Sequence, residues 1–551
     1  MCSKLIRKNR VNFQINTWSI LSLVFIFLIL LPNLNIFVNI FNKTNENWAH
    51  IKQYLLKDYI INSLIIVVFT GLFTIIIGVS LSWIISAYNF PLRSFFKWAI
   101  ILPLAIPPYI AAYTYSGIFS YTGVIQKFLR NALNLQANQK YFDIMSIKGT
   151  IFIFTIFLFP YVYIITKAFL ERQSSSLIEN ARLLGRSPFE IFLYVVLPIS
   201  RVSIIGGASL VILEVLNDYG VVQYFGVPTL STAIFKTWFS MGDINSSIKL
   251  SAILMMMVLL ILVLEKAMRG RRKYGYTTAK TRPISRQELK GIKGLLASGF
   301  CFIIFSLGFL IPALQLLQWS LLTFRKILNI EFLELIFNTF SIASLTSALI
   351  VIMAVVIANY SRITSGITSK IYPKITVAGY SIPGAIIAVG VIVLFINLDN
   401  NLYWLYKLIN PKSGKLVLST SIVMLIFSYM IRFLGIGYNS IEAGFEKVGK
   451  KYFEASRTLG MNITQTFFKV DLKMIKTAIL SSFLLVFVDI LKELPLTLIL
   501  RPFNFNTLAT KTFQYANDEM VQEAAISSMI IIIISVVSTY VFYRLEEREV
   551  R

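Results

Sequence analysis

Long apolar runs alternate with short polar segments along the whole chain. A helix needs about 20 predominantly apolar residues to cross the hydrocarbon core of a bilayer, and this criterion predicts roughly twelve spans. We place them near 17–40, 60–85, 98–120, 149–170, 191–217, 245–266, 294–322, 338–358, 375–396, 415–437, 475–498 and 524–543. The pattern therefore predicts an all-α polytopic membrane protein.

Composition supports this class and excludes others. The chain has 551 residues, of which 56% are hydrophobic and 14% are charged, as expected of a protein that spans a membrane repeatedly. Its formal charge of +26 is distributed between the apolar runs and forms no single basic stripe, so we expect no nucleic-acid partner. Because Cys2 and Cys301 are far apart and His50 is the only histidine, we predict no tight metal site and no histidine-dependent catalysis.

The distribution of basic residues predicts the topology. The first apolar run follows "MCSKLIRKNR", is longer than the core of a signal peptide and lacks a small-residue cleavage site, so we interpret it as an anchor. With residue 1 in the cytoplasm, roughly 33 basic residues lie in cytoplasmic segments and about 14 on the other side. Both termini are therefore predicted to be cytoplasmic, and the basic segment 266–293 is predicted to be a cytoplasmic linker.

The two halves of the chain resemble each other. Polar and small residues of the first half reappear 275 positions later: Glu179, Ala181, Arg182 and Gly185 as Glu454, Ser456, Arg457 and Gly460. Nearly the same shift relates Asn62–Ser63 to Asn338–Thr339, Ile106–Pro107 to Ile382–Pro383, Asp218 to Glu493, and "TLSTAIF" to "TLATKTF". We therefore predict two homologous six-helix halves, 1–265 and 294–551. An even number of spans per half implies a pseudo-twofold axis along the membrane normal.

A repeated motif falls in one predicted cytoplasmic loop of each half, 171–200 and 438–474. Residues 178–184 are expected to form a short helix that Gly185 ends in the left-handed conformation, before Ser187–Pro188 begins the next helix. Glu179 and Glu454 would lie near helix N-termini, where a carboxylate is favoured. An orienting role and a role in partner contact are both open for these two acids.

This motif resembles the cytoplasmic coupling loop of binding-protein-dependent ABC importer permeases. That loop reads Glu-Ala-Ala, three residues, Gly, nine residues, an apolar residue, one residue, then Leu-Pro. The first copy matches at Glu179, Ala181, Gly185, Leu197 and Pro198, with Asn180 in place of an alanine. The second matches at Glu454, Ala455 and Gly460, but Ser456 replaces an alanine and Leu472–Lys473 replaces Leu-Pro.

The segments 102–117, 216–243 and 491–519 are similar to those of fused permeases that import ferric iron. The resemblance implies a bacterial cytoplasmic (inner) membrane protein that accepts substrate from an extracytoplasmic binding protein. It also implies two copies of a separate ATPase subunit that use ATP and Mg, while this chain binds no cofactor, is not an enzyme and requires no homodimer. Thiamine or another small solute, or an ion-coupled secondary transporter, remain the alternatives.

The segment "GFEKVGKK" at 444–451 has the glycine and lysine spacing of a phosphate-binding loop. A true loop of that kind follows a strand and carries Ser or Thr after the lysine to hold magnesium. Here Lys451 occupies that position, and the aligned first-half segment has neither Gly449 nor Lys450. We therefore expect ATP to be hydrolysed by a partner.

Acidic residues near the ends of two spans are candidates for a substrate path, because carboxylates inside a membrane are costly and face a cavity or a partner. They are Glu214 and Asp218 in the first half and Asp489 and Glu493 in the second. The spacing of four predicts that each pair shares one helix face. Tyr219 and Tyr224 would add phenolic oxygens, which suit a hard cation such as ferric iron. Ion pairs with Lys492 or Arg501, or contact with the binding protein, are equally open.

Overall fold

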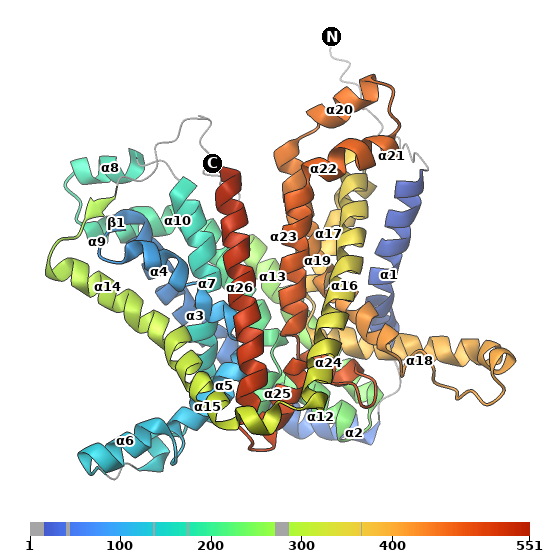
Figure 1. The fold of residues 1–551 in the computed structure, drawn as a ribbon, viewed down its shortest axis with the longest axis horizontal. Helices are drawn as coiled ribbons and strands as arrows, with labels where there is room; N and C mark the ends of the chain where they lie inside the picture. The colour runs from blue at the N-terminus through green and yellow to red at the C-terminus, as the bar shows by residue number, and fades with distance from the viewer. Residues whose placement is uncertain are drawn as a thin grey trace. The chain divides into compact units, whose positions relative to one another are not determined.

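A computed structural model describes residues 16–39, 45–135, 138–172, 176–269, 286–364 and 366–550. These residues are almost entirely helical (Figure 1). The basic segment before residue 16 and most of the predicted linker, 270–285, lie outside the described residues. The end of the linker forms a two-residue parallel bridge, in which β2 (Gln287–Glu288) pairs with β1 (Tyr88–Asn89).

Nine described helices are long and apolar enough to cross a membrane, or eleven if each of two bent helix pairs counts as one span. A further apolar helix, Thr17–Pro32, is shorter. Every predicted apolar run is largely helical, so the all-α polytopic class is confirmed. Four boundaries were wrong. The run 98–120 breaks at Pro107 and the run 375–396 at Pro383, each between two helices. The helix predicted from 415 begins at Ile422, and the helix begun near 475 ends at Leu491 instead of 498.

The chain forms two compact units that do not follow the halves of the sequence repeat. The N-unit comprises the described residues within 44–332 and 509–536, and the C-unit those within 1–43, 333–508 and 537–551. Each unit thus contains the leading helix of the other half. In the C-unit, α1 (Thr17–Asn39) packs on α17 and α18, and in the N-unit, α14 and α15 pack on α4 and α5.

The N-unit is built around α7 (Ile147–Arg172), which packs between α3 (Leu56–Ala87) and α10 (Leu197–Asn217). Its other elements are α2 (Glu46–His50), α4 (Arg93–Ala99), α5 (Pro108–Phe119), α6 (Val124–Leu133), α8 (Ser176–Leu183), α9 (Pro188–Ile191), α11 (Gly220–Tyr224), α12 (Leu230–Phe239), α13 (Ile244–Arg269), α14 (Ile292–Phe305), α15 (Ile311–Ile327), the π-helical turns η1 (Ile51–Leu55), η4 (Phe192–Val196) and η5 (Ser306–Leu310), and the 3₁₀ turns η2 (Leu102–Ala105) and η3 (Gln139–Tyr141).

The C-unit is built around α19 (Ile422–Val448), which packs against α17 (Thr368–Ser381) and α23 (Lys476–Leu491). Its other elements are α1, most of α16 (Ile330–Ile363), α18 (Gly384–Ile409), α20 (Lys451–Thr458), α21 (Ile463–Thr466), the π-helical turn η6 (Phe467–Asp471), α22 (Leu472–Met474) and α24 (Pro495–Leu500). Helices α25 (Leu508–Asn517) and α26 (Ala524–Val550) contribute to both units.

The sequence repeat extends to individual hydrogen bonds. In the N-unit the backbone N–H of Leu230 donates to Ser63 Oγ at 3.1 Å, and in the C-unit the N–H of Leu508 donates to Thr339 Oγ1 at 2.9 Å. Pro107 and Pro383 precede α5 and α18 with nearly equal dihedral angles, φ −56° and ψ 139° against φ −53° and ψ 139°. The polar and proline pairs found in the sequence therefore occupy matching structural positions.

Candidate functional site

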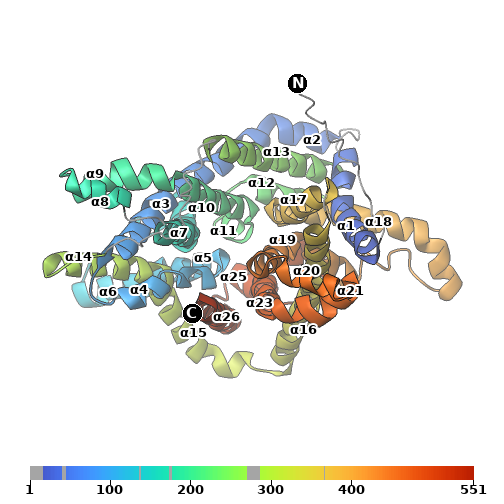
Figure 2. The same ribbon diagram turned by 90° about the horizontal axis from the view of Figure 1, so that it is seen from above.

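The first repeated motif forms a helix–turn–helix at one end of the N-unit, where α8 and α9 lie side by side (Figures 1 and 2). Gly185 ends α8 with φ +76°, a conformation that residues with a Cβ rarely adopt. The N–H of Arg186 donates to the carbonyl of Ala181 at 3.1 Å, which closes the helix end. Ser187 then begins α9 with a capping box to Glu190.

The second motif has the same local structure at one end of the C-unit. Helix α20 is followed by Gly460 with φ +85°, and the N–H of Met461 donates to the Ser456 carbonyl at 3.2 Å. Asn462 begins α21 with a capping box to Gln465. The boundaries of α8, α9 and η4 each differ from those of α20, α21 and η6 by 275 residues, so the predicted helix–turn–helix is confirmed in both copies.

The motif residues divide into packed and exposed positions. Ala181 and Ser456 are the buried members, whereas Glu179, Glu454 and Ala455 are exposed. Both acids lie in the first turn of their helices, as predicted. In the Leu-Pro ending of the first copy, Leu197 is half-buried and Pro198 is exposed. Their roles in coupling stay predictions.

Each loop also exposes a leucine directly before its glycine. Leu184 is 81% exposed and Leu459 is 79% exposed. Contact with water does not stabilise an apolar leucine side chain. The sequence motif did not single out these residues. An apolar residue at the same place in both copies is the signal that would have identified them.

The two loops are held to their neighbouring helices by different chemistry. Beneath α8 lies an apolar cluster, made of Trp83, Ala87, Leu170, Ile178, Ala181, Ile191 and Val196. Beneath α20, Arg362 at the end of α16 lies 2.5 Å from Asp471 in η6. The side chains of Arg362 and Asp471 are only 9% and 1% exposed, so this ion pair is buried.

The loops also differ in how they continue into the next span. In the first copy the helical path Pro188–Asn217 runs as one span. In the second copy Ile463–Met474 and Lys476–Leu491 meet at an angle of 73°. The two copies therefore share a helix–turn–helix but not the connection that follows it.

The segment with phosphate-loop spacing belongs to the second helix–turn–helix. Gly444 lies inside α19, and Gly449 ends that helix with φ +71°. The next helix begins at Lys451. The two glycines thus lie within and at the end of one helix, whereas a phosphate-binding loop lies between a strand and a helix.

In the first half the acidic candidates lie around the end of α10. Glu214 lies within the helix, but α10 ends at Asn217 and Asp218 has extended backbone angles. Asp218 Oδ1 accepts a hydrogen bond from the N–H of Val221 at 2.8 Å, at the start of α11. Tyr219 stacks on Phe235 with ring centroids 3.6 Å apart, and burial raises the pKa of Tyr219 to about 12.

The second half repeats this geometry. Glu493 lies beyond the end of α23 and accepts a hydrogen bond from the N–H of Leu496 at 3.1 Å, at the start of α24. The prediction that each pair shares one helix face is therefore wrong, because the helix ends before the second acid. Asp489 pairs with Lys492 at 2.8 Å. Glu493 lies 3.4 Å from Arg432. The sequence indicated Arg501 as a possible ion-pair partner and did not indicate Arg432.

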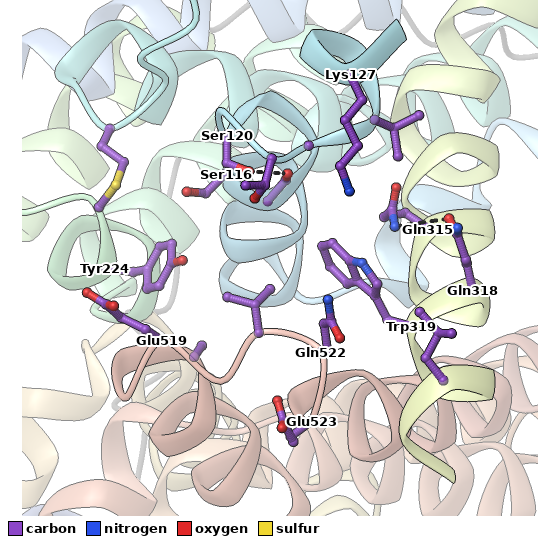
Figure 3. A pocket seen from close by; sticks show the side chains of 18 of the residues that line it. Ser116, Ser120, Lys127, Tyr224, Gln315, Gln318, Trp319, Glu519, Gln522 and Glu523 are labelled. Atoms are coloured by element: carbon purple, nitrogen blue, oxygen red, sulfur yellow. Dashed lines mark hydrogen bonds between the residues drawn. The ribbon is translucent and has the colours of Figure 1, made fainter. Parts of the chain in front are cut away.

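A polar pocket of about 710 Å³ opens in the N-unit, at the end opposite α8 (Figures 1 and 3). Figure 3 shows Tyr224, Glu519 and Glu523 around it, and its lining also includes Ser116, Ser120, Lys127, Gln315, Gln318, Trp319 and Gln522. Lys326 donates to Glu523 at 2.7 Å and lowers the pKa of that carboxyl. Burial raises the pKa of Tyr224. Within the described residues, no cluster of three or more Asp, Glu, His or Cys side chains is arranged to hold a metal ion.

A polytopic helical protein with a duplicated helix–turn–helix outside its spans has the architecture of a membrane transport permease. Residues 75–269 and 350–551 match the family model described as "Binding-protein-dependent transport system inner membrane component". The chain belongs to this family. The two matches confirm the internal repeat, and the protein is an ABC importer permease, a class of transport proteins and not of enzymes.

The relatives are named for different substrates, and they align with this chain over different lengths. The chain is 26% identical over 485 residues to "Fe(3+)-transport system permease protein FbpB 2" of Haemophilus influenzae, covering 87% of this chain and 88% of that protein. It is 22% identical over 493 residues to the "Putative ferric transport system permease protein FbpB 1" of the same organism, covering 85% and 74%. The "Sulfate transport system permease protein CysT" of Salmonella typhimurium is 26% identical over 207 residues, 37% of this chain and 72% of that protein.

Proposed function

We propose that this permease imports ferric iron delivered by an extracytoplasmic binding protein, and that two separate ATPase subunits drive it through the two helix–turn–helix loops. Two relatives named for ferric transport align with most of the chain, including both copies of the repeat. The sulfate permease aligns with 37% of it. The relatives named for ferric transport thus match this chain as a two-half permease, which supports iron as the cargo.

The observation that carries the coupling assignment is the duplicated loop itself. Each copy presents an exposed leucine, Leu184 or Leu459, beside a left-handed glycine, and a capping box begins the helix that follows. An apolar side chain on a short, well-defined helix is suited to a groove on a partner. Since there are two such loops, we infer two ATPase subunits for each chain. Closure of the ATPases would move the loops as rigid bodies and tilt the attached helices.

The polar pocket supports a hard cation as cargo. Tyr224, Glu519 and Glu523 offer phenolic and carboxylate oxygens (Figure 3), the donor type that ferric iron prefers. A permease must also release its cargo, and the raised pKa of Tyr224 and the engagement of Glu523 by Lys326 both weaken these donors. We infer transient contact at this pocket. We also propose that Asp218 and Glu493 line the substrate path, next to the short helices α11 and α24 that they cap.

The packing of α1 supports a cytoplasmic N-terminus. Trp18 Nε1 donates to Thr464 Oγ1 at 3.3 Å, which places the beginning of α1 beside α21 of the second loop. In the C-unit, Figure 1 shows the end of α26 at the same end as α20. If the loops face the ATPases, then both chain ends are cytoplasmic. Labelling of a cysteine introduced at position 16 only by a reagent that crosses the membrane would agree, whereas labelling from outside would contradict it.

The test is reconstitution in vesicles with an ABC ATPase subunit and an extracytoplasmic binding protein from the same organism. Uptake of radioactive ferric iron, thiamine and sulfate is measured with ATP, without ATP, and with a non-hydrolysable analogue. We expect iron uptake that requires both hydrolysis and the binding protein. Uptake of thiamine or sulfate instead would refute the iron assignment, and uptake that needs no ATPase would refute the importer mechanism.

A further inference from the structure

The anchor of the second coupling loop brings four residues together from separate elements. Arg362 comes from the end of α16, and its Nη2 lies 2.5 Å from Oδ2 of Asp471. The guanidinium carbon lies 4.2 Å from the ring centroid of Phe445 in α19 and 5.3 Å from that of Phe453 in α20. One arginine of α16 therefore contacts the coupling helix α20, the π-helical turn η6 and the span α19.

The same four positions exist in the first copy with different side chains. At a shift of 275, Asp471, Phe445 and Phe453 correspond to Val196, Leu170 and Ile178, which all belong to one buried apolar cluster. Helices α3 and α16 are related by a shift of 276, as the pair Ser63 and Thr339 shows, so Arg362 corresponds to the buried Ser86, which precedes Ala87 of that cluster. The repeat has thus kept the geometry of the anchor while its chemistry changed from apolar packing to a buried ion pair.

The ion pair is poorly explained as a stabilising device. Nε and Nη1 of Arg362 and Oδ1 of Asp471 have no hydrogen-bond partner among the described residues, although all three atoms are buried. Taking two charges out of water costs free energy that an incompletely bonded pair does not fully offset, and apolar residues would hold the site as well. The first copy shows that they do so in this fold.

The bend after the second loop provides a reason for a directional contact. In the first copy, movement of the loop passes straight into the unbroken helix Pro188–Asn217. In the second copy, the path bends by 73° between Met474 and Lys476. Asp471 lies on the loop side of this bend, and its partner Arg362 lies on α16. A charged pair resists sliding in a way that apolar contacts do not, because its strength depends on geometry.

We propose that Arg362 and Asp471 are positioning residues that transmit movement of the second coupling loop to α16, a route that the first loop does not need. The proposal rests on the coupling function proposed above. It makes the two loops mechanically unequal. The first acts on the helix that follows it, and the second acts chiefly on α16, with the stack of Arg362 on Phe453 fixing the direction of α20.

The decisive variant is Arg362→Ala combined with Asp471→Val, which replaces both charges with apolar side chains and gives position 471 the valine found at position 196 of the first copy. Because both charges are removed together, no unpaired charge stays buried, and the thermal unfolding temperature should remain near that of the unchanged protein. We expect iron taken up per ATP hydrolysed to fall by about tenfold while ATP hydrolysis continues. Arg362→Lys keeps the charge but not the planar stack, and it should retain an intermediate ratio.

The control removes the exposed pair Glu288–Lys290, 3.5 Å apart, by Glu288→Ala with Lys290→Ala, and should leave the ratio unchanged. A double variant of Arg362 and Asp471 that is stable and transports with the normal ratio would overturn the proposal. If the unchanged protein shows no ATP-dependent uptake, the proposed function fails first. A normal ratio in the unchanged protein and in the double variant would refute only the route through α16.

Discussion

The two coupling loops have the same backbone and different foundations. Both consist of a short helix, a left-handed glycine and a capped second helix, with boundaries that correspond residue by residue. Yet α8 rests on an apolar cluster, whereas α20 is held by Arg362 and Asp471. The difference teaches that duplication preserved the backbone of the loop more strictly than the contacts behind it. Four experiments test how far this contrast extends.

The largest effect should come from breaking one anchor at a time. Arg362→Ala leaves Asp471 buried without its partner and should lower the free energy of unfolding by about 3–5 kcal/mol. In the first loop, Val196→Ala at the position that matches Asp471 removes only apolar atoms and should cost about 2 kcal/mol. Thermal unfolding in detergent compares the two. Equal losses would show that the ion pair contributes no more than packing.

The next effect concerns a contact that the copies share. Ser63→Ala and Thr339→Val each remove the acceptor for a buried backbone N–H, that of Leu230 or Leu508. Each change should cost about 1–3 kcal/mol, and the two losses should be similar. Thr339→Ser keeps the hydroxyl and serves as the control. Faster hydrogen exchange at the Leu230 and Leu508 amides would identify the cause, and losses in one copy only would mean that the repeat is not equivalent here.

Valine at either loop glycine should disturb coupling more than stability. A Cβ at Gly185 or Gly460 would meet no atom within 4 Å, so Gly185→Val and Gly460→Val cost only backbone strain, about 1–2 kcal/mol. The altered turn misdirects the loop, and the double variant should hydrolyse ATP without iron uptake. Gly185→Asn is the control, since asparagine tolerates the left-handed region. Normal uptake by the double variant would remove the coupling assignment.

The smallest effect should be the same in both loops. Ser187→Ala and Asn462→Ala each delete one capping box and should cost about 1 kcal/mol of local stability. Limited proteolysis within the loops measures this loss, and Ser187→Asn and Asn462→Ser, which exchange the two caps, should restore protection. A much larger effect in the second loop would show that α21 depends on its cap more than α9 does.

Local features were predictable because their causes lie close together in the chain. Gly185 and Gly460 end helices, and Pro188 begins the next helix in the first copy, for reasons contained within a few residues. The apolar runs identified the helices in the same way. The sequence indicated the candidate acids but not the ends of the helices at Asn217 and Leu491. In a sequence, an acid that caps the next short helix looks the same as an acid that continues the preceding helix.

The sequence by itself determined the class of protein, the repeat and the two loops, since span length, helix caps and a nearly constant shift of about 275 residues are properties of the chain. Only the tertiary structure revealed that α1 packs with the second half and α15 with the first. It alone paired Arg362 with Asp471, 109 residues apart, and brought Tyr224 and Glu519 to one pocket. Hydropathy marks which residues leave water, but contacts between distant segments follow from how the helices pack together, which no local pattern encodes.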